Sequence, residues 1–353
     1  MRARRLALAA LAAASAAVQL LWAGLLLTAV WHARLVSPPP TFLLRDRHGQ
    51  FLGEVGAARG PARGNREETE LGYWPVPELP PRVVAATLAL EDRHFPSHPG
   101  VDPRAVARAL LQNLRHGERV SGASTLAMQV ARMQRPGSRG YLRKAGEAIT
   151  AVLLTARYGR TEVLRHYLRI VPYGNRIHGI AYAARRYFDK PVEDLSWAEI
   201  AFLAGIPQAP GKMNVFLPAG RRRAVERGQR VLRDLAARGV LSAAELELAE
   251  RQLAALRIPY KGRRAEESLH AVLRLEALLG GLRESRAQPL VATTLDLDLQ
   301  REVAWRTDRA VRNWADRGAG NAAVIVVDVR SHEVLAWVGS ADYFDQGQAG
   351  AID

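Results

Sequence analysis

The chain has 353 residues, with 50 Lys or Arg against 35 Asp or Glu, so its formal net charge at pH 7 is +15. Its 48% hydrophobic content excludes a mainly disordered chain, and the absence of cysteine excludes disulfides, thiolate metal sites and cysteine nucleophiles. The length suggests two domains. The excess of basic residues predicts an anionic partner, which could be nucleic acid, membrane phosphates or a phosphorylated substrate.

The N-terminus carries a long apolar segment. Residues 6–31 form an uncharged run of 26 residues behind three arginines, long enough at about 1.5 Å per residue to cross a hydrocarbon core of about 30 Å. The arginines predict that residues 1–5 stay cytoplasmic and that the remainder is exported. We favour an uncleaved transmembrane anchor, with a signal peptide cleaved near Ala14-Ser-Ala16 as the alternative. An exported, anchored chain argues against nucleic acid and for phosphates at the membrane surface.

The segments behind the anchor predict a strand region followed by a long helical region. Residues 37–78 are interpreted as a linker that contains a short β-hairpin at 41–55. Residues 79–258 have helical patterns almost throughout. Ser196 and Ser242 each precede a glutamate by three residues, which is the capping-box pattern of a helix start.

The C-terminal segments predict a return to strands. Residues 259–290 are interpreted as a linker with a short helix. Within 291–353, two β-branched runs at 322–329 and 334–338 flank a polar turn, which predicts a second hairpin.

Glu91 is the first candidate for chemistry. Val84, Leu88 and Glu91 have the spacing i, i+4, i+7 on a predicted helix that begins at Pro80-Pro81, so they share one face. A carboxylate at the end of an apolar stripe is suited to general acid or base catalysis. The alternative is a structural ion pair with an arginine such as Arg93.

Two further segments carry polar groups suited to sugars or phosphates. Gly122-Ala-Ser-Thr-Leu-Ala-Met-Gln129 is a small, polar loop that enters a helix, although Ser124 or Thr125 could simply cap that helix. Arg143-Lys-Ala-Gly-Glu147 places two cations and a carboxylate on one helix surface, with an ordinary intrahelical ion pair as the alternative. Gly146 costs helix stability, so we expect a close approach to the backbone there.

These segments, taken in order, resemble a known family. Glu91-Asp-Arg-His-Phe-Pro-Ser-His-Pro-Gly100, the loop 122–129 and the segment 143–147 look like the first three motifs of the peptidoglycan glycosyltransferases (glycosyltransferase family 51). These enzymes form the glycosyltransferase half of class A penicillin-binding proteins. Residues 162–174 resemble the fourth motif and residues 227–232, more loosely, the fifth.

The resemblance implies a fold and a substrate. We expect a mainly α, lysozyme-like glycosyltransferase domain over 79–258, preceded by one transmembrane helix. Residues 291–353 resemble the opening of an α/β transpeptidase domain, especially in the penicillin-binding protein 1C subgroup, and the chain stops before that active site. The implied reaction polymerises lipid II, releases undecaprenyl pyrophosphate and inverts the anomeric carbon.

The resemblance also implies residue roles. Glu91 would be the general base on the acceptor hydroxyl, and Glu147 would assist departure of the pyrophosphate, directly or through a divalent metal such as Mg²⁺ or Mn²⁺. Arg143 and Lys144 would stabilise the developing charge. No organic cofactor is expected. The two carboxylates should lie about 7–12 Å apart to admit both sugars. The remaining expected substrate-binding residues are Asp92, Phe95, His98, Gly122, Ser124, Thr125 and Gln129.

The fourth motif departs from the family pattern, because Arg165 and Arg169 stand where an acid and an asparagine are usual. We expect this change to affect efficiency more than fold. His166, Arg176 and His178 are interpreted as structural residues.

The expected partners are lipid II, the nascent glycan strand and membrane phospholipids. No serine has a lysine three positions later, so we expect no transpeptidase activity from this chain, and a partner chain carrying that domain, or another cell-wall synthase, is the expected complement. The expected location is the extracytoplasmic side of the inner membrane. Two alternatives stay open: a catalytically weak or inactive accessory protein that binds lipid II or synthases, and a glycan-cleaving enzyme.

Overall fold

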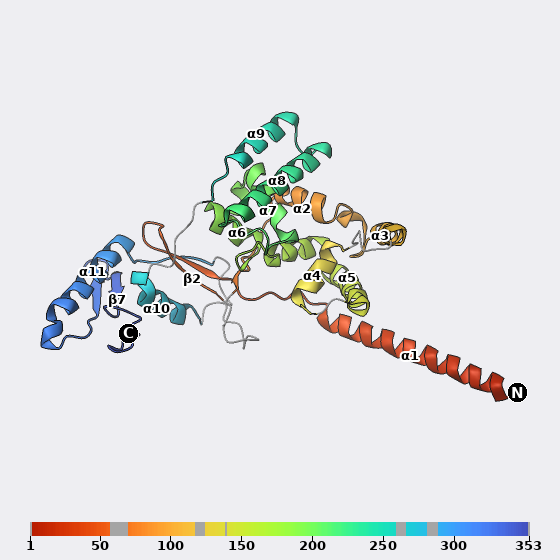
Figure 1. Ribbon diagram of the computed structural model, residues 1–353, viewed down its shortest axis with the longest axis horizontal. Coiled ribbons are helices and arrows are strands. Elements are labelled where there is room, and N and C mark those ends of the chain that lie inside the picture. Colours follow the sequence, from red (N-terminus) through yellow and green to blue (C-terminus); the bar gives the residue numbers. More distant parts are fainter. Residues whose placement is uncertain are drawn as a thin grey trace.

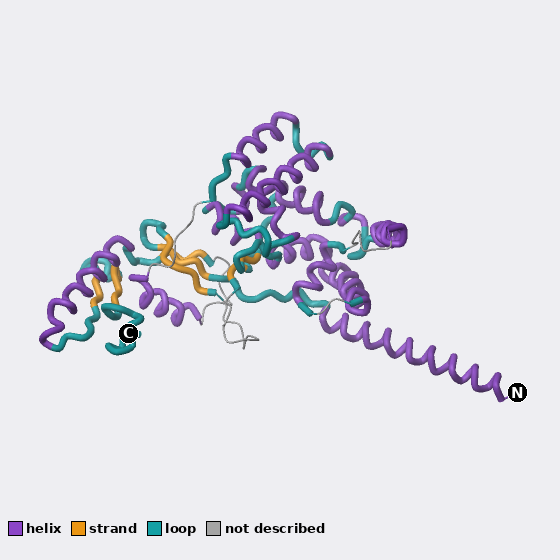
Figure 2. Tube along the Cα trace, in the orientation of Figure 1, coloured by secondary structure: helices purple, strands orange, loops and turns teal. Residues whose placement is uncertain are grey.

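The fold is mainly α-helical, as predicted (Figures 1 and 2). The computed structural model describes residues 2–56, 70–116, 124–137, 140–258, 266–280 and 289–351. Among these residues the strands form one three-stranded and two two-stranded sheets. Figure 1 shows a helical body with a long helix projecting from one end and a smaller mixed unit at the other.

Helix α1 (Arg2–His32) is the projecting helix. Its 22-residue segment Leu11–His32 contains an 18-residue stretch with a mean hydropathy of 1.8, and it is long and apolar enough to cross a membrane. Most of its large apolar side chains are exposed, for example Leu20 at 74% and Leu27 at 72%. Only the end of the helix packs on the body, where Ala29 and Ala33 are buried. An apolar surface that the protein leaves uncovered fits the predicted membrane anchor.

The helical body holds the larger core. Its helices are α2 (Pro81–Glu91), α3 (Pro103–His116), α4 (Leu126–Gln134), α5 (Tyr141–Ile170), α6 (Ile180–Phe188), α7 (Trp197–Gly205), α8 (Pro218–Ala237) and α9 (Ala243–Ala254). The short strands β3 (Leu71–Gly72) and β4 (Ile177–His178) pair in parallel beside them. Helix α7 is almost entirely buried and packs against α2, α8 and α9.

Two helix starts follow the predicted capping-box pattern. Ser196 Oγ accepts a hydrogen bond from the backbone N–H of Glu199, and the Glu199 carboxylate accepts one from the backbone N–H of Ser196. Ser242 and Glu245 form the same pair at the start of α9. These reciprocal bonds satisfy backbone N–H groups that have no partner within the helix, so both helices begin at the predicted serines.

The predicted first hairpin is present, but it is more than a linker. Strands β1 (Phe42–Arg45) and β2 (Phe51–Val55) pair antiparallel, and β5 (Leu290–Ala292) adds to β1 in parallel. Side chains alternate along β1, so Phe42 and Leu44 pack with α10 (Leu269–Gly280) while Leu43 packs into the core of the helical body. Strand β1 therefore lies between the two cores and joins the helical body to the C-terminal unit.

The C-terminal unit contains α11 (Leu297–Trp314) and the predicted second hairpin, formed by β6 (Val324–Val327) and β7 (Val334–Val338). Gln300 on α11 is fully buried. Its amide donates to the Trp337 carbonyl over 2.8 Å, and its side-chain oxygen accepts from the Trp337 N–H over 2.7 Å. These bonds fix the helix against the hairpin. The expected linker 259–290 lies partly outside the described residues; α10 is the short helix that it was predicted to contain.

Candidate active site

Glu91 is the last residue of α2, and its two carboxylate oxygens have different surroundings. Oε2 accepts a hydrogen bond of 2.8 Å from the side-chain amide of Gln129 on α4. Oε1 is shielded from solvent and has no hydrogen-bond partner among the described residues. One oxygen is therefore held in place, and the other has an unused capacity to accept a hydrogen bond.

Two buried tyrosines lie close enough to Glu91 to respond to its charge. Burial raises the pKa of the Tyr167 and Tyr173 phenols, and the negative charge of Glu91 raises both further. Both phenols therefore stay neutral at physiological pH. The two tyrosines therefore place phenol groups near Glu91 without adding a second negative charge.

Asp92 and His98 are buried and fix the loop behind Glu91. His98 Nε2 lies 3.0 and 3.1 Å from the two Asp92 oxygens, while His98 Nδ1 accepts a hydrogen bond from the Gly100 N–H. Since a carboxylate only accepts, Nε2 must be the protonated nitrogen. Phe95 is buried with its ring edge against His98. This burial favours a positioning role over the direct substrate contact that the sequence predicted for these three side chains.

The second segment begins α4 and is tied to the first. Thr125 is the N-cap of α4: its hydroxyl accepts from the Met128 N–H and donates to the Gly100 carbonyl. The capping alternative considered for Thr125 is therefore present. Ser124 directly precedes it and is half-buried, while Gly122 lies outside the described residues. Through Thr125 and Gln129 this segment positions Glu91 and the loop behind it.

Arg143 and Glu147 form the predicted pair on α5. Arg143 Nε lies 3.0 Å from Glu147 Oε1, and the Arg143 guanidinium also donates to the Arg135 carbonyl at the end of α4. The Glu147 side chain is 13% exposed and that of Arg143 26%, so the pair is largely shielded from water and its charges act strongly on any ligand beside it. Lys144 is half-buried and is not among the residues that line the cavity described next.

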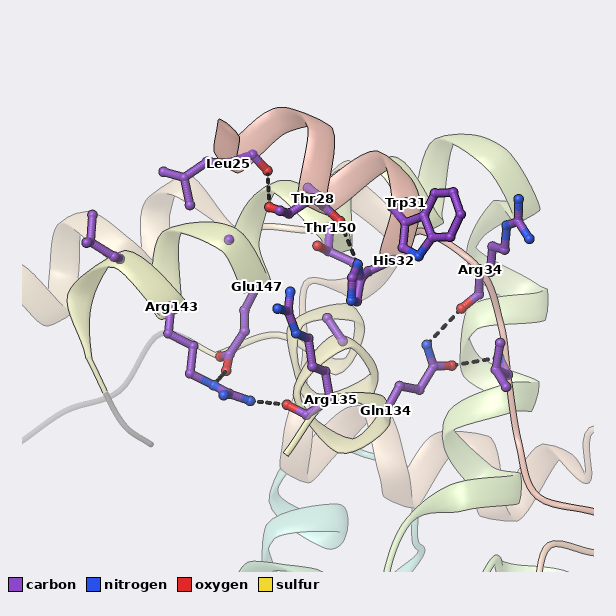
Figure 3. Close-up of a pocket in the computed structure, with 15 residues that line it drawn as sticks. Leu25, Thr28, Trp31, His32, Arg34, Gln134, Arg135, Arg143, Glu147 and Thr150 are labelled. Atoms are coloured by element: carbon purple, nitrogen blue, oxygen red, sulfur yellow. Dashed lines mark hydrogen bonds and ion pairs between the residues drawn. The ribbon is translucent and has the colours of Figure 1, made fainter. Parts of the chain in front are cut away.

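A cavity of about 610 Å³ opens beside this pair (Figure 3). Its walls come from the end of α1, the end of α4 and the first turns of α5, and they include Glu147, Arg143 and Arg135. In Figure 3 the Arg135 side chain lies between Glu147 and His32. Three arginines against one glutamate give the cavity a net positive charge, so it favours an anion.

The candidate residues thus form two groups, one beside the first half of α4 and one beside its C-terminal end. Glu91 meets Gln129, the fourth residue of the helix, and Glu147 faces the cavity near the end of the helix, where Gln134 and Arg135 also lie. The five steps from Gln129 to Gln134 correspond to about 7.5 Å along the helix axis. Glu91 is not among the residues that line the cavity. A single groove shared by both carboxylates stays a prediction.

The described residues do not form a preformed metal site at Glu147. No group of three or more His, Asp or Glu side chains among them is arranged to hold a metal ion. Glu147 contributes one carboxylate, which is already paired with Arg143. A divalent ion there would depend on phosphate oxygens from a substrate.

The two unusual arginines of the fourth segment have structural partners. Arg165 forms an ion pair with Glu162 one turn earlier, and Arg169 Nε donates to the Tyr73 carbonyl over 2.9 Å. Burial and the charge of Arg169 lower the pKa of His166 to about 4, so this histidine is neutral. His178 stacks on Tyr73. Arg165 therefore pairs within α5, and only Arg169 connects the end of α5 to the residue that follows β3.

The contribution of α1 and the end of α4 to the cavity was not predicted from the sequence. His32, Arg34, Gln134 and Arg135 line it, and none of them belongs to the motifs quoted above. The one available signal was Gly146, where a close approach was expected. The approaching group is α1, since a Cβ at Gly146 would lie 3.9 Å from Leu25 Cδ2.

Comparison with known proteins agrees with these motifs. The family model described as "Transglycosylase" matches residues 60–236. Penicillin-binding protein 1C of Escherichia coli (strain K12) is 33% identical over 296 residues, which cover 80% of this chain and 35% of that protein. Penicillin-binding protein 2D of Bacillus subtilis (strain 168) is 32% identical over 339 residues, which cover 94% of this chain and 47% of that protein.

A solved structure of penicillin-binding protein 1A from Haemophilus influenzae aligns with 80% of this chain and 31% of its own, at 20% identity and a TM-score of 0.40. The chain spans less than half the length of the two relatives above. The family match itself covers 177 of 353 residues, from 60 to 236, and includes Glu91, Gln129, Arg143 and Glu147. The chain therefore belongs to the transglycosylase family, and its helical body is a glycosyltransferase domain of the class A penicillin-binding protein type, similar to that of penicillin-binding protein 1C.

Proposed function

We propose that the chain is a peptidoglycan glycosyltransferase that polymerises lipid II into glycan strands and releases undecaprenyl pyrophosphate. The observation that carries the proposal is the placement of two chemically different groups along α4, one at Gln129 and one beyond Gln134. Glu91 has one carboxylate oxygen held by Gln129 and one buried oxygen without a hydrogen-bond partner among the described residues, and the Arg143–Glu147 pair borders a cationic cavity. A base and an anion site are the two parts that displacement of a pyrophosphate from a sugar requires.

The reaction assigns a role to each group. Oε1 of Glu91 accepts the proton of the acceptor hydroxyl. At the same time the oxygen of that hydroxyl bonds to the anomeric carbon of the donor sugar. Gln129 keeps the carboxylate oriented through Oε2. The bond from the anomeric carbon to the pyrophosphate oxygen breaks, and the pyrophosphate leaves with the electron pair. Direct displacement from the opposite face inverts the anomeric configuration.

The leaving group needs charge stabilisation more than protonation. Arg143 presents a planar guanidinium suited to phosphate oxygens, and Glu147 fixes its orientation through the 3.0 Å contact. We assign Lys144 a supporting electrostatic role from the same helix. The position of Glu91 relative to α4 is fixed by the hydrogen bonds of Asp92, Thr125 and His98, which join α2 and the loop behind it to α4. The proposal assigns no step to a metal ion.

The proposed location follows from α1. We place α1 in the inner membrane, with the three N-terminal arginines on the cytoplasmic side and the helical body on the periplasmic side. Lipid II presents its sugars at that surface, next to the end of α1. The nascent glycan strand, membrane phospholipids and a chain carrying a transpeptidase domain are the proposed partners.

The test uses the full chain purified in detergent with fluorescent lipid II. We expect a ladder of glycan strands on a gel that a muramidase digests, together with released undecaprenyl pyrophosphate. The assay is repeated with excess chelator and with added Mg²⁺ or Mn²⁺ to establish whether a divalent metal contributes. Binding of lipid II without polymer would instead favour the accessory protein, and release of sugar from purified sacculi would favour the glycan-cleaving enzyme.

A further inference from the structure

Basic side chains are concentrated where α8 begins. Residues 200–233 contain seven Lys or Arg and a single acid, Glu226. Four of the seven lie in the first two turns of α8 or in the loop before them, and all four are exposed. They are Lys212, Arg221, Arg222 and Arg223, and we call them the α8 basic cluster. None of them lines the cavity beside Glu147.

The cluster lacks the partners that other arginines of α8 have. Arg233 Nε lies 3.4 Å from a carboxylate oxygen of Glu250 on α9. The stem of Arg227 packs beside Gly205, where a Cβ would lie 3.1 Å from the Arg227 Cγ. Within the part of the chain that the structure describes, the four cations of the cluster form no ion pair. Their charge is therefore available to an anionic partner.

The loop before α8 connects the cluster to the Glu91 half of the site. Phe216 of this loop packs against the Tyr187 ring, with 5.8 Å between the ring centres. The Tyr187 hydroxyl donates to the Tyr173 carbonyl over 2.9 Å. Tyr173 lies close enough to Glu91 for the carboxylate to raise its pKa. The cluster therefore belongs to the side of the body where the acceptor sugar would bind.

The cluster also lies away from the membrane helix. Figure 1 shows α8 on the upper side of the helical body, whereas α1 leaves from the opposite, lower end. The packing agrees, because α1 packs mainly on α5 while α8 packs on α7, α9 and α2. With α1 in the membrane, lipid head groups lie on the far side of the body from the cluster. An anionic partner must therefore reach the cluster from the aqueous side.

We propose that the α8 basic cluster binds the peptide carboxylates of the glycan strand. This inference rests on the proposed function, in which the strand is made at Glu91. The peptides of peptidoglycan end in carboxylates, and a guanidinium can bind a carboxylate through two parallel hydrogen bonds. Peptides recur along one strand, so contacts that are weak one by one add up. The cluster thus retains the strand on the enzyme between successive additions.

The test is equilibrium binding of fluorescently labelled, uncross-linked glycan strands to the full chain in detergent. One sample of strands carries its peptides, and a second has lost them to an amidase that cleaves peptide from sugar. Vesicles that contain an anionic phospholipid are a third probe. The cluster variant combines Arg221→Gln, Arg222→Gln and Arg223→Gln.

The matched control removes the same charge from exposed positions of the C-terminal unit. It combines Arg309→Gln, Arg317→Gln and Arg330→Gln. All six side chains are exposed, so both variants should fold, and their melting temperatures check this.

We expect the cluster variant to bind peptide-bearing strands about 10-fold more weakly than the wild type, because charge-assisted contacts to carboxylates are lost. The wild type should bind stripped strands about 10-fold more weakly than peptide-bearing strands, and the cluster variant should not distinguish the two. The control should match the wild type. Both differences should disappear near 1 M salt, where the Debye length is about 3 Å. In lipid II polymerisation the cluster variant should release shorter strands.

Equal binding of peptide-bearing and stripped strands by the wild type overturns the inference without any variant. A cluster variant that binds peptide-bearing strands as the wild type does also overturns it, and so does an equal loss in the control. If the cluster variant loses binding to vesicles and keeps binding to strands, the cluster is a membrane contact and the inference is wrong. The strands are made beforehand, so a wild type that fails to polymerise lipid II refutes the proposed function separately.

Discussion

Asp92 accepts a hydrogen bond of 3.0 Å from the backbone N–H of Leu126, which joins the end of α2 to the first turn of α4. The same carboxylate accepts from His98 Nε2. Asp92 therefore accepts hydrogen bonds from two directions. Its neighbour Glu91 accepts a hydrogen bond from Gln129, which belongs to the same helix, α4. The position of the candidate base depends on this buried carboxylate.

Replacing Asp92 should destabilise the protein. In Asp92→Asn the new NH₂ group must point at either His98 Nε2 or the Leu126 N–H. Both of these groups are hydrogen-bond donors, so one buried contact becomes donor against donor. We expect a loss of about 1–3 kcal/mol in stability, measured as a lowered melting temperature in detergent. The matched control is Asp316→Asn at an exposed position near the end of α11. Equal melting temperatures for both variants would show that Asp92 does not hold the two helices together.

Gly100, the last residue of the first motif, has a backbone conformation that favours glycine. Its φ is +112°, and a Cβ would lie 2.4 Å from the Ala151 carbonyl oxygen on α5. We expect Gly100→Ala to lose several kcal/mol of stability, since both strain and backbone overlap oppose it. Gly211→Ala is the control, because a Cβ there meets nothing within 4 Å. The measurement compares the melting temperatures of Gly100→Ala and Gly211→Ala in detergent. A Gly100→Ala protein as stable as the control would contradict this loop conformation.

His166 should make stability depend on pH. Its pKa is about 4 in the folded protein, against 6.5 for an unperturbed histidine, because of burial and the charge of Arg169. Below pH 6.5 the unfolded chain binds a proton that the folded chain does not, so this contribution is complete above pH 6.5 and is lost as the pH falls toward 4. The loss approaches about 3 kcal/mol.

The measurement compares urea denaturation at pH 7 and pH 4.5 for the wild type and His166→Gln. The wild type should lose more stability than the variant over this interval. His332→Asn serves as the control, since His332 is exposed and asparagine accepts its left-handed backbone. An identical pH dependence in the wild type and His166→Gln would mean that His166 is readily protonated in the folded protein.

Gln134 should determine the mobility of the segment that leaves the anchor. Gln134→Ala removes both hydrogen bonds, so the Val36 amide should exchange its hydrogen about 5- to 10-fold faster. Gln134→Glu keeps an acceptor for the Val36 N–H but loses the donor to the Arg34 carbonyl. Val36 should therefore stay protected in Gln134→Glu. Hydrogen exchange by NMR in micelles distinguishes the two variants, and equal exchange rates would refute the assigned hydrogen bonds.

Local patterns in the sequence predicted the elements that depend on neighbouring residues. The capping boxes at Ser196 and Ser242 and both hairpins need only short-range information, and all are present. The face of α2 was predicted less accurately. Val84 and Leu88 are half-buried, whereas the fully buried side chains are Val83, Ala86 and Thr87. The i, i+4, i+7 pattern placed the stripe about one position away from its buried centre, because α7 and α8 decide which side of α2 is covered.

Long-range contacts could not be predicted from the sequence. Strand β1 pairs with β5 nearly 250 residues later, and no periodicity within 41–55 indicates that pairing. The approach of α1 to Gly146 is similar, since the glycine signalled a close neighbour but not its identity. For the same reason Arg34 and Arg135 were missed, because both acquire their place only when α1 packs beside α4 and α5.

The role of Glu91 as the base is the central claim. The most direct test is the initial rate of lipid II polymerisation by Glu91→Gln, with Glu193→Gln at an exposed position as the control. Glutamine can still accept from Gln129, so the variant should fold and melt like the wild type. We predict a rate at least about 100-fold below the wild type for Glu91→Gln and an unchanged rate for the control. A folded Glu91→Gln protein that polymerises lipid II at the wild-type rate would contradict the account.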